Sequence, residues 1–333
     1  MTAKQFSVAL VGCGSVAKNH LNAISKLENV KIAALCDTKR DRAISLAECF
    51  APDARIYESY EEMLVKEDVD SIHICTPHYL HFPMASYALK KNINVFLEKP
   101  ITINTEDADA LIKIEKESKA KLCICFQNRF LKAVADAKEI LEKDGGVEAA
   151  YCSVFWRRSE EYYTESGWRG KYATEGGGVM INQAIHTLDL LSQFIGKPRS
   201  VRATTANHHL SGIIEVEDTC EGIIYFENGK QANFYATTSA MCTDDTLIVL
   251  ETKNHRIELR LPNITVDGVT TSYENDMHII GKKCYGNGHE QLIARYYEAL
   301  ATDAEMPVTA ESAKCALSIL LAAYKSCDKE IAI

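Results

Sequence analysis

The sequence lacks a long uncharged hydrophobic run, a block rich in lysine and arginine, and any pair of cysteines in a CxxC pattern. The first absence excludes a membrane-spanning helix. The chain also starts on a strand pattern without the apolar segment of a signal peptide, so we expect a cytoplasmic protein with no membrane partner. The second absence, together with a net charge of −9, argues against a nucleic-acid partner.

Cysteine is plentiful, but its spacing is uninformative. The twelve cysteines are scattered from Cys13 to Cys327, and His208-His209 is an adjacent pair rather than one at helical spacing. A zinc site requires cysteine or histidine in paired spacing, so we expect no bound metal. We interpret the cysteines as reduced, mostly buried small hydrophobic residues.

The first third of the chain alternates short apolar runs with amphipathic helical patterns. Near-continuous apolar strands between such helices indicate a parallel sheet covered on both faces. The expected strands are 7–11, 31–36, 71–75, 94–97 and 121–126, and the expected helices are 15–27, 40–50, 82–91 and 106–119.

The pattern changes after Gln127. Alternating runs at 148–156, 200–207, 219–226, 231–238, 247–251 and 256–259 indicate a mainly antiparallel sheet. Helical patterns occur at 130–143, 180–194, 289–301 and 310–327. We therefore predict an α/β protein with two domains. These are a doubly wound parallel dinucleotide-binding domain at 1–122 and, at 123–333, an α/β domain with a large open sheet for substrate binding and oligomerisation.

The strongest local pattern is Gly12-Cys13-Gly14-Ser15-Val16-Ala17, which lies between the first expected strand and helix. This is the context that a dinucleotide fingerprint requires. Gly12 permits the tight turn, Gly14 lets the backbone approach a pyrophosphate, and Ala17 allows close packing of the helix. The helix N-terminus, with Ser15 and Val16, then faces the anion.

Asp37 follows the second expected strand at the distance from Gly12 at which a carboxylate accepts hydrogen bonds from the adenosine ribose. The same carboxylate repels a 2′-phosphate, so we predict NAD as the cofactor. Lys39 and Arg40 follow at once and can pair with a phosphate, which keeps NADP as an alternative.

Three triplets close later strands of the first domain: Thr76-Pro77-His78, Glu98-Lys99-Pro100 and Gln127-Asn128-Arg129. Ligands of open parallel sheets bind at the carboxyl ends of strands, so these residues are expected to border the cofactor crevice. Lys99 is either a proton donor or acceptor with a pKa lowered by its site, or a surface lysine beside a turn-forming proline.

A second group lies in the stretch from Glu175 to Asp189, where three glycines precede a helical pattern. We expect the glycines to leave the first backbone amides of the helix accessible. Asn182, His186 and Asp189 are spaced i, i+4 and i+7, so they share one helix face. Such a polar face either borders a cleft or is a satisfied structural set.

Two loops are further candidates. The first contains Trp156-Arg157-Arg158, Tyr162-Tyr163 and Trp168-Arg169, and it either closes over the cofactor, grips an anionic substrate group, or packs between domains. The second runs from Tyr285 to His289 and is either a substrate contact or an ordinary helix start.

Four motifs in this order resemble the Gfo/Idh/MocA oxidoreductases over nearly the whole chain. They are Gly12-x-Gly14-x-x-Ala17-x-x-His20, Thr76-Pro77-x-x-x-His81, Glu98-Lys99-Pro100 and Gly176-Gly177-Gly178 with Asn182, His186 and Asp189. The resemblance implies hydride transfer between a nicotinamide and a secondary alcohol of a sugar, polyol or nucleotide sugar, in a homodimer or homotetramer. It also implies that Lys99 and His186 meet at the nicotinamide.

The resemblance assigns residues to roles. Catalysis falls to Lys99, His186 and Asn182, with His186 as the preferred base and Lys99 as the orienting donor, or the reverse. Many relatives acting on simple polyols have aspartate at position 182, whereas relatives acting on nucleotide-linked N-acetyl sugar acids are similar to this Asn-Gln version. The cofactor contacts are expected from Gly12, Gly14, Ser15, Val16, Asp37, Thr76, Pro77, His81, Glu98, Lys99, Gln127, Trp168 and Arg169, and the substrate contacts from Lys99, Arg129, Asn182, His186 and Tyr285.

Two other functions are consistent with the same fold. One is a glycosidase that uses tightly held NAD for a transient oxidation and elimination. The other is a non-catalytic sensor that binds a dinucleotide and a partner protein, although such a protein has no need of both Lys99 and His186.

Overall fold

The computed structural model describes residues 4–241, 245–274 and 282–333, and the chain forms two compact units. The first unit consists of residues 4–102, 106–127 and 287–312, and the second of 103–105, the described part of 128–286, and 313–333. The boundary predicted after residue 122 therefore passes through a strand of the first unit, and a late helix belongs to that unit as well. Among the described residues, no helix is long and apolar enough to span a lipid bilayer.

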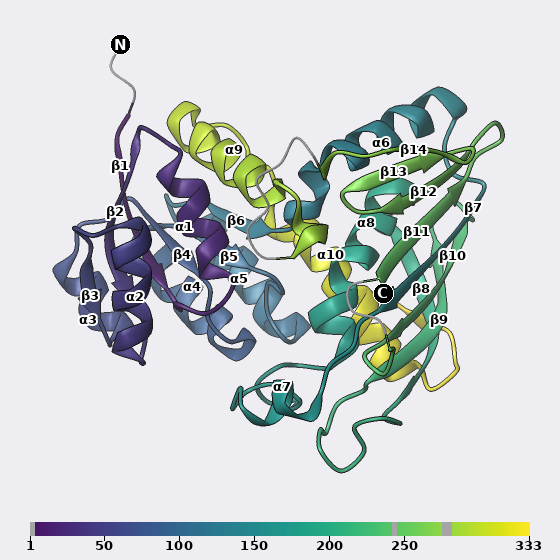
Figure 1. Ribbon diagram of the computed structural model, residues 1–333, viewed down its shortest axis with the longest axis horizontal. Helices are drawn as coiled ribbons and strands as arrows, with labels where there is room; N and C mark the ends of the chain where they lie inside the picture. Colours follow the sequence, from purple (N-terminus) through teal and green to yellow (C-terminus); the bar gives the residue numbers. More distant parts are fainter. Residues whose placement is uncertain (1–3, 242–244, 275–281) are drawn as a thin grey trace. The chain divides into compact units, whose positions relative to one another are not determined.

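The first unit contains a six-stranded parallel sheet in the order β3-β2-β1-β4-β5-β6, with helices beside it (Figure 1). Its strands are β1 (Phe6–Val11), β2 (Val30–Cys36), β3 (Arg55–Tyr57), β4 (Ser71–Ile74), β5 (Asn94–Glu98) and β6 (Leu122–Cys125). Its helices are α1 (Ala17–Ser25), α2 (Arg40–Phe50), α3 (Tyr60–Lys66), α4 (His81–Lys90), α5 (Thr105–Glu117) and α9 (Gly288–Thr302). This order confirms the predicted doubly wound sheet.

The second unit contains a nine-stranded sheet in the order β14-β13-β12-β11-β7-β10-β9-β8-β15. Among the described strands of this sheet β7 and β10 are the one parallel pair, so the sheet is mainly antiparallel, as predicted. Its strands are β7 (Ala149–Phe155), β8 (Pro198–Ala206), β9 (Thr219–Phe226), β10 (Gln231–Thr237), β11 (Asp245–Glu251), β12 (Arg256–Arg260), β13 (Asn263–Val266), β14 (Val269–Thr271) and β15 (Ile331–Ala332). Its helices are α6 (Lys132–Asp144), α7 (Glu160–Thr164), α8 (Ile185–Ile195) and α10 (Ala310–Ser326).

Local chemistry explains where several elements begin and end. The Ser59 hydroxyl accepts a hydrogen bond from the Glu62 amide and so caps α3, a helix that the sequence pattern did not predict. Gly145 ends α6 in the left-handed conformation, with φ of 82°. Strands β1, β4 and β6 of the first sheet are almost entirely buried, which is why they read as continuous apolar runs rather than as alternating ones.

Candidate active site

The glycine loop between β1 and α1 has the geometry of an anion cradle. Gly12 has φ of +89°, and a Cβ there would lie 2.6 Å from the carbonyl carbon of Cys75. Only glycine fits this close approach to the end of β4. A Cβ on Gly14, by contrast, would meet nothing within 4 Å, so this side of the loop is open. Ser15 is exposed, and Val16 leads into the buried Ala17 of α1.

Asp37 lies directly beside this loop. Its carboxylate accepts hydrogen bonds from the Cys13 and Lys39 amides, both at 2.8 Å. The side chain therefore ties the end of β2 to the glycine loop, and each oxygen retains a lone pair for a ribose hydroxyl. Arg40, which was predicted as a possible phosphate partner, lies 3.7 Å from Glu58 instead.

The loop that follows β4 carries Thr76 and Pro77, both half-buried at the carboxyl edge of the sheet. His81 is fully buried, with Nδ1 2.6 Å from the Pro100 carbonyl oxygen and Nε2 3.0 Å from the Thr76 carbonyl oxygen. The ring therefore connects the loops after β4 and β5. A direct contact between His81 and a cofactor, as predicted, does not fit this burial, and we interpret His81 as a residue that positions the two loops.

Glu98 ends β5 as a buried carboxylate in a histidine network. His20 Nε2 lies 2.8 Å from its Oε1, and His289 Nε2 lies 3.8 Å from the same oxygen. Burial opposes ionisation of Glu98, but the hydrogen bond from His20 and the nearby His289 ring outweigh it and hold its pKa well below the usual range. His289 lies in the first turn of α9, as the alternative of an ordinary helix start predicted, and its buried ring faces Glu98 within the first unit.

Lys99 follows Glu98 and is half-buried, and its amide lies 3.3 Å from Glu98 Oε2. The histidine network therefore fixes the backbone from which the Lys99 side chain extends. Gln127, after β6, is also buried, and its Oε1 lies 3.9 Å from the Cys125 thiol.

Sequence spacing did not predict that His20, Glu98, Cys125 and His289 would meet. Their donor atoms all lie within 4.8 Å of one another, although the residues come from four separate elements. The contacts measured among them include the His20–Glu98 hydrogen bond, and His20 Nδ1 also lies 2.9 Å from His73 Nδ1. No local pattern reveals such a cluster, because only the sheet order brings α1, β5, β6 and α9 together.

In the second unit, the three glycines serve packing rather than leaving amides open. The Gly178 and Met180 amides donate to the buried Glu217 carboxylate, at 2.9 and 3.0 Å. A Cβ on Gly178 would lie 1.8 Å from the Glu217 carbonyl oxygen, and one on Gly177 would lie 2.0 Å from the Tyr324 hydroxyl. The expectation of accessible amides is therefore wrong, because a side chain distant in sequence already accepts their hydrogen bonds.

The segment after the glycines is a π-helical turn, Met180–Ala184, that continues into α8. Its i→i+5 bonding interrupts the period that placed Asn182, His186 and Asp189 on one face. Asn182 Nδ2 lies 2.5 Å from Glu175 Oε1 and 3.4 Å from the Tyr162 hydroxyl. Single π turns inside helices occur frequently at functional sites.

His186 is half-buried and lines a small pocket on the sheet side of α8. Tyr285, the predicted substrate contact, lines the same pocket. The remaining lining residues are Asn128, Trp156, Gln183, Thr187, Thr246, Ile248, Leu259, Leu261 and Cys284. Gln183 and Asn128 are buried, and the side-chain oxygens Gln183 Oε1 and Asn128 Oδ1 have no hydrogen-bond partner among the described residues.

Arg129 and Asp189 form a buried pair, with Arg129 Nε donating to Asp189 Oδ2 at 2.8 Å and Nη2 to Oδ1. Only 7 % of the Arg129 side chain is exposed. Burial raises the pKa of Asp189, and the guanidinium opposes that rise. Arg129 was predicted as a substrate contact, whereas this bidentate geometry gives it a structural partner on α8.

Trp168 and Arg169 lie in the loop after α7. The Arg169 guanidinium stacks over the Trp168 ring at 4.6 Å and over the Tyr162 ring at 4.4 Å. Through Tyr162 this loop contacts Asn182, so these predicted cofactor residues lie beside the predicted substrate residues within the second unit.

The first unit fits a dinucleotide. The end of β1 leads into an open glycine turn and the N-terminus of α1, and the end of β2 carries the Asp37 carboxylate. The carboxyl ends of the neighbouring strands β4, β5 and β6 carry the other predicted cofactor residues, which are Thr76, Pro77, Glu98, Lys99 and Gln127. This is the edge at which doubly wound sheets bind their ligands. The turn between β1 and α1 holds space where a pyrophosphate would lie.

Comparison with known proteins gives the same result. Residues 6–126 match the profile described as "Oxidoreductase family, NAD-binding Rossmann fold", and residues 134–255 match the "GFO/IDH/MocA C-terminal domain".

The whole chain aligns with individual members. It is 24% identical to the uncharacterized oxidoreductase YrbE of Bacillus subtilis, with 97% of this chain and 94% of that protein covered. It is 25% identical to the inositol 2-dehydrogenase of Rhizobium meliloti, with 95% of each covered. The WlbA dehydrogenase of Bordetella pertussis, solved with NADH and UDP-GlcNAcA, superimposes with a TM-score of 0.86 at 25% identity over 99% of both chains. The chain belongs to the Gfo/Idh/MocA oxidoreductase family and is an NAD-binding oxidoreductase.

Proposed function

We propose that this protein transfers a hydride between NAD and a secondary alcohol of a sugar, polyol or nucleotide sugar. The observation that carries the proposal is the placement of Lys99 at the carboxyl end of β5, next to the dinucleotide edge of the first unit. The motif resemblance assigns His186 of the second unit to the same reaction. The names of its relatives agree, since they include inositol 2-dehydrogenase and D-glucoside 3-dehydrogenase.

The chain's own residues handle the proton. In the oxidative direction His186 removes the hydroxyl proton while the carbinol carbon loses its hydrogen as hydride, leaving a ketone. Lys99 donates a hydrogen bond to the same oxygen and polarises it. Bound NAD supplies the hydride acceptor. The roles of Lys99 and His186 can be exchanged without changing this balance.

Asn182 is a positioning residue in this scheme. An amide cannot act as a general base, and its Nδ2 already donates to Glu175 and Tyr162. These bonds fix the orientation of Asn182 beside the start of α8. The Asn182 side chain then orients the substrate hydroxyl or His186, and its replacement by aspartate would place two carboxylates together at Glu175.

NAD is the proposed cofactor in preference to NADP. Asp37 lies at the ribose position, and the nearby Arg40 already pairs with Glu58.

We also propose a homodimer or homotetramer joined through the sheet of the second unit. Along β7 exposed and buried residues alternate, and Tyr151 is 41% exposed. Size-exclusion chromatography with light scattering tests the assembly.

The experiment that tests the proposed function follows absorbance of reduced nicotinamide while the protein and NAD, then NADP, meet a panel of polyols, aldoses, sugar acids and nucleotide sugars. We expect a rise with one substrate class. Lys99→Met and His186→Ala should each lower kcat by at least about 100-fold with NAD binding retained. The exposed residues Lys90 and His208 provide matched controls, Lys90→Met and His208→Ala.

Two outcomes would overturn the proposal. Sugar release without net NADH, with cofactor surviving gel filtration, would identify the redox-neutral glycosidase. Tight NAD binding with no turnover on any carbohydrate, and affinity for a partner protein that depends on NAD, would identify the sensor.

A further inference from the structure

Three cationic side chains in the second unit lie over aromatic rings and form what we term the basic aromatic cluster. Lys282 Nζ lies 3.6 Å from the centre of the Trp156 ring, and the Arg158 guanidinium lies 4.9 Å from the same ring and 4.8 Å from Tyr162. Arg169 covers the other end, over Tyr162 and Trp168. The cluster is therefore Trp156, Arg158, Tyr162, Trp168, Arg169 and Lys282.

This cluster adjoins the pocket that contains His186. Trp156 belongs to both, and its Nε1 donates to Thr246 at 3.0 Å on the pocket wall. At the other side, the Tyr162 hydroxyl lies 3.4 Å from Asn182 Nδ2. Trp156 therefore links the pocket that contains His186 to Arg158, and Tyr162 links Asn182 to both Arg158 and Arg169.

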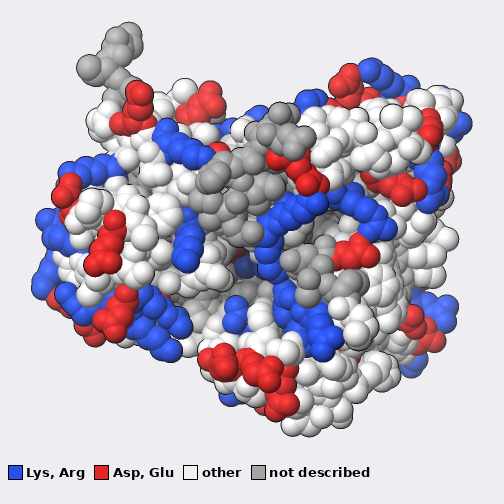
Figure 2. Space-filling model, viewed as in Figure 1, with Lys and Arg blue, Asp and Glu red and all other residues white. Residues whose placement is uncertain are grey.

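The two arginines carry charge that the described part of the chain does not neutralise. Neither Arg158 nor Arg169 takes part in an ion pair among the described residues, and the Nε atom of each is buried without a hydrogen-bond partner there. Within the described ranges, Arg158 Nη1 donates to the Arg157 carbonyl oxygen, at 2.8 Å. Figure 2 shows acidic atoms gathered at α7, and among the described residues neither Glu160 nor Glu161 of that helix forms an ion pair with Arg158 or Arg169.

Positive charges held close together in a chain of net charge −9 raise the electrostatic energy unless an anion joins them. Guanidinium groups suit this task because their N–H groups bind carboxylate and phosphate oxygens in pairs. The aromatic rings fix the guanidinium planes in advance, which lowers the entropy lost on binding.

The pocket itself presents hydrogen-bond acceptors. Gln183 is 4% exposed and Asn128 is 8% exposed, and the oxygen of each side-chain amide has no partner among the described residues. Buried acceptors are costly unless a donor reaches them. Sugar hydroxyls and an amide N–H are donors of the right kind.

We propose that the substrate of this enzyme is an anionic sugar whose carboxylate or phosphate is bound by Arg158 and Arg169, while Gln183 and Asn128 accept hydrogen bonds from its hydroxyl or amide groups. The inference rests on the proposed function and names the substrate class of that same site. Lys282 adds positive potential at the Trp156 end of the cluster.

The two tryptophans of the chain, Trp156 and Trp168, are both in the cluster, so intrinsic fluorescence reports on it directly. The wild-type protein with NADH is titrated, with tryptophan excitation at 295 nm, with glucose, glucuronate, glucose 6-phosphate and a UDP-sugar acid. We expect saturable changes only with anionic sugars, and a Kd that rises with salt concentration. Binding of glucuronate tests whether the bound group is a carboxylate, and binding of glucose 6-phosphate tests whether it is a phosphate.

Variants then test the arginines. Arg158→Gln and Arg169→Gln should each weaken anionic-sugar binding about 10- to 100-fold, mainly as KM in turnover, because each removes charge-assisted hydrogen bonds. Arg199→Gln removes an exposed arginine of β8 that pairs with Glu330, and it should leave binding within about twofold. Circular dichroism establishes that each variant is folded.

The outcomes separate this inference from the proposed function. Turnover of neutral sugars, unchanged in both arginine variants and unaffected by salt, would overturn the inference and leave the dehydrogenase intact. Salt-dependent binding of anionic sugars without any hydride transfer would overturn the dehydrogenase and leave the anion site intact. If the variants unfold, the wild-type titration and its salt dependence decide the question by themselves.

Discussion

At the scale of single residues, two glycines of one loop serve different ends. Gly12 adopts φ of +89° against the Cys75 backbone, whereas Gly14 faces open space. We expect Gly12→Ala to destabilise the first unit by about 1–3 kcal/mol from its backbone conformation alone, with more from the clash. Gly14→Ala should leave the melting temperature unchanged but weaken NAD binding at least about tenfold, because its methyl group fills the cradle. Thermal melts with and without NAD measure both effects, and full NAD affinity in Gly14→Ala would contradict the assignment of the loop.

Glu217 is a second residue whose chemistry can be tested. Burial raises its pKa to about 7, against the hydrogen bonds it accepts from Gly178 and Met180. The folded state therefore binds a proton that the unfolded state has lost, so this group's contribution to stability falls as pH rises from about 4.5 through 7. The loss amounts to about 3 kcal/mol.

Glu217→Gln should remove that part of the pH dependence. Urea unfolding followed by tryptophan fluorescence, which reports on the second unit, should show a pH 5 to pH 8 difference smaller by about 2–3 kcal/mol than in the wild type. The exposed Glu215 supplies the control, Glu215→Gln. An equal pH dependence in all three proteins would show that Glu217 ionises in the fold as freely as in water.

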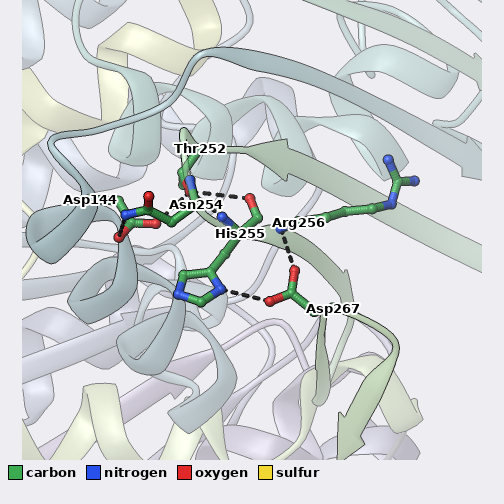
Figure 3. Close-up of polar contacts among 6 residues, drawn as sticks. All are labelled: Asp144, Thr252, Asn254, His255, Arg256 and Asp267. Atoms are coloured by element: carbon green, nitrogen blue, oxygen red, sulfur yellow. Dashed lines mark hydrogen bonds and ion pairs between the residues drawn. The ribbon is translucent and has the colours of Figure 1, made fainter.

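At the scale of elements, the turn between β11 and β12 is held by one side chain from α6 and one from the turn between β13 and β14 (Figure 3). Asp144, at the end of α6, accepts hydrogen bonds from Thr252 and from Asn254. On the other side, His255 Nδ1 lies 2.7 Å from Asp267, which also accepts from the Arg256 amide at 2.9 Å. The hydrogen bond with Asp267 raises the pKa of His255.

Because the pKa of His255 is raised in the folded protein, the stability of this turn depends on pH. A histidine with a raised folded-state pKa stabilises the fold below its unfolded pKa of about 6.5, and the gain is lost as pH rises through the folded value. Protection of the Arg256 amide against hydrogen exchange should therefore fall between pH 6 and 8, beyond the intrinsic change in rate. We expect His255→Gln to lack this fall, and His208→Gln to retain it. A fall that persists in His255→Gln would assign it to another group.

At the scale of the whole molecule, the first unit is discontinuous in sequence. Helix α9, at 288–302, buries Tyr296 and Tyr297 against the first sheet, where their hydroxyls lie 2.7 Å from Ser71 Oγ and 2.8 Å from His73 Nε2. A fragment of residues 1–127 would leave these strand residues uncovered. It should bind the dye ANS and lack a cooperative melt.

A second fragment that joins residues 287–312 to the first through a flexible linker should melt cooperatively and bind NAD. A cooperative melt in the 1–127 fragment alone would show that α9 is dispensable for the first unit. Far-ultraviolet circular dichroism and calorimetry distinguish the cases.

Much of the fold could be predicted from the sequence, because the patterns that indicate its strands, helices and glycine turn involve residues close together along the chain. Apolar strands between helices predicted the doubly wound sheet, alternating runs predicted the antiparallel one, and the turn from Gly12 to Ala17 indicated the cofactor edge. Short elements escaped prediction: β3 has three residues and β15 has two, too few to show a period. The family resemblance, and with it NAD and the oxidoreductase chemistry, came from motif order.

The partners of the site residues were decided by the tertiary structure. Glu217 occupies the glycine-rich turn, Asp189 holds Arg129, and His289 reaches Glu98 across most of the chain's length. In each case a buried charge or amide needs a partner, and sheet order and helix packing determine which side chain is near enough to be that partner. The sequence by itself determined the elements and the cofactor edge, because those depend on neighbours along the chain. Only the fold decided which polar groups neutralise one another and which, like Arg158 and Arg169, form no ion pair among the described residues.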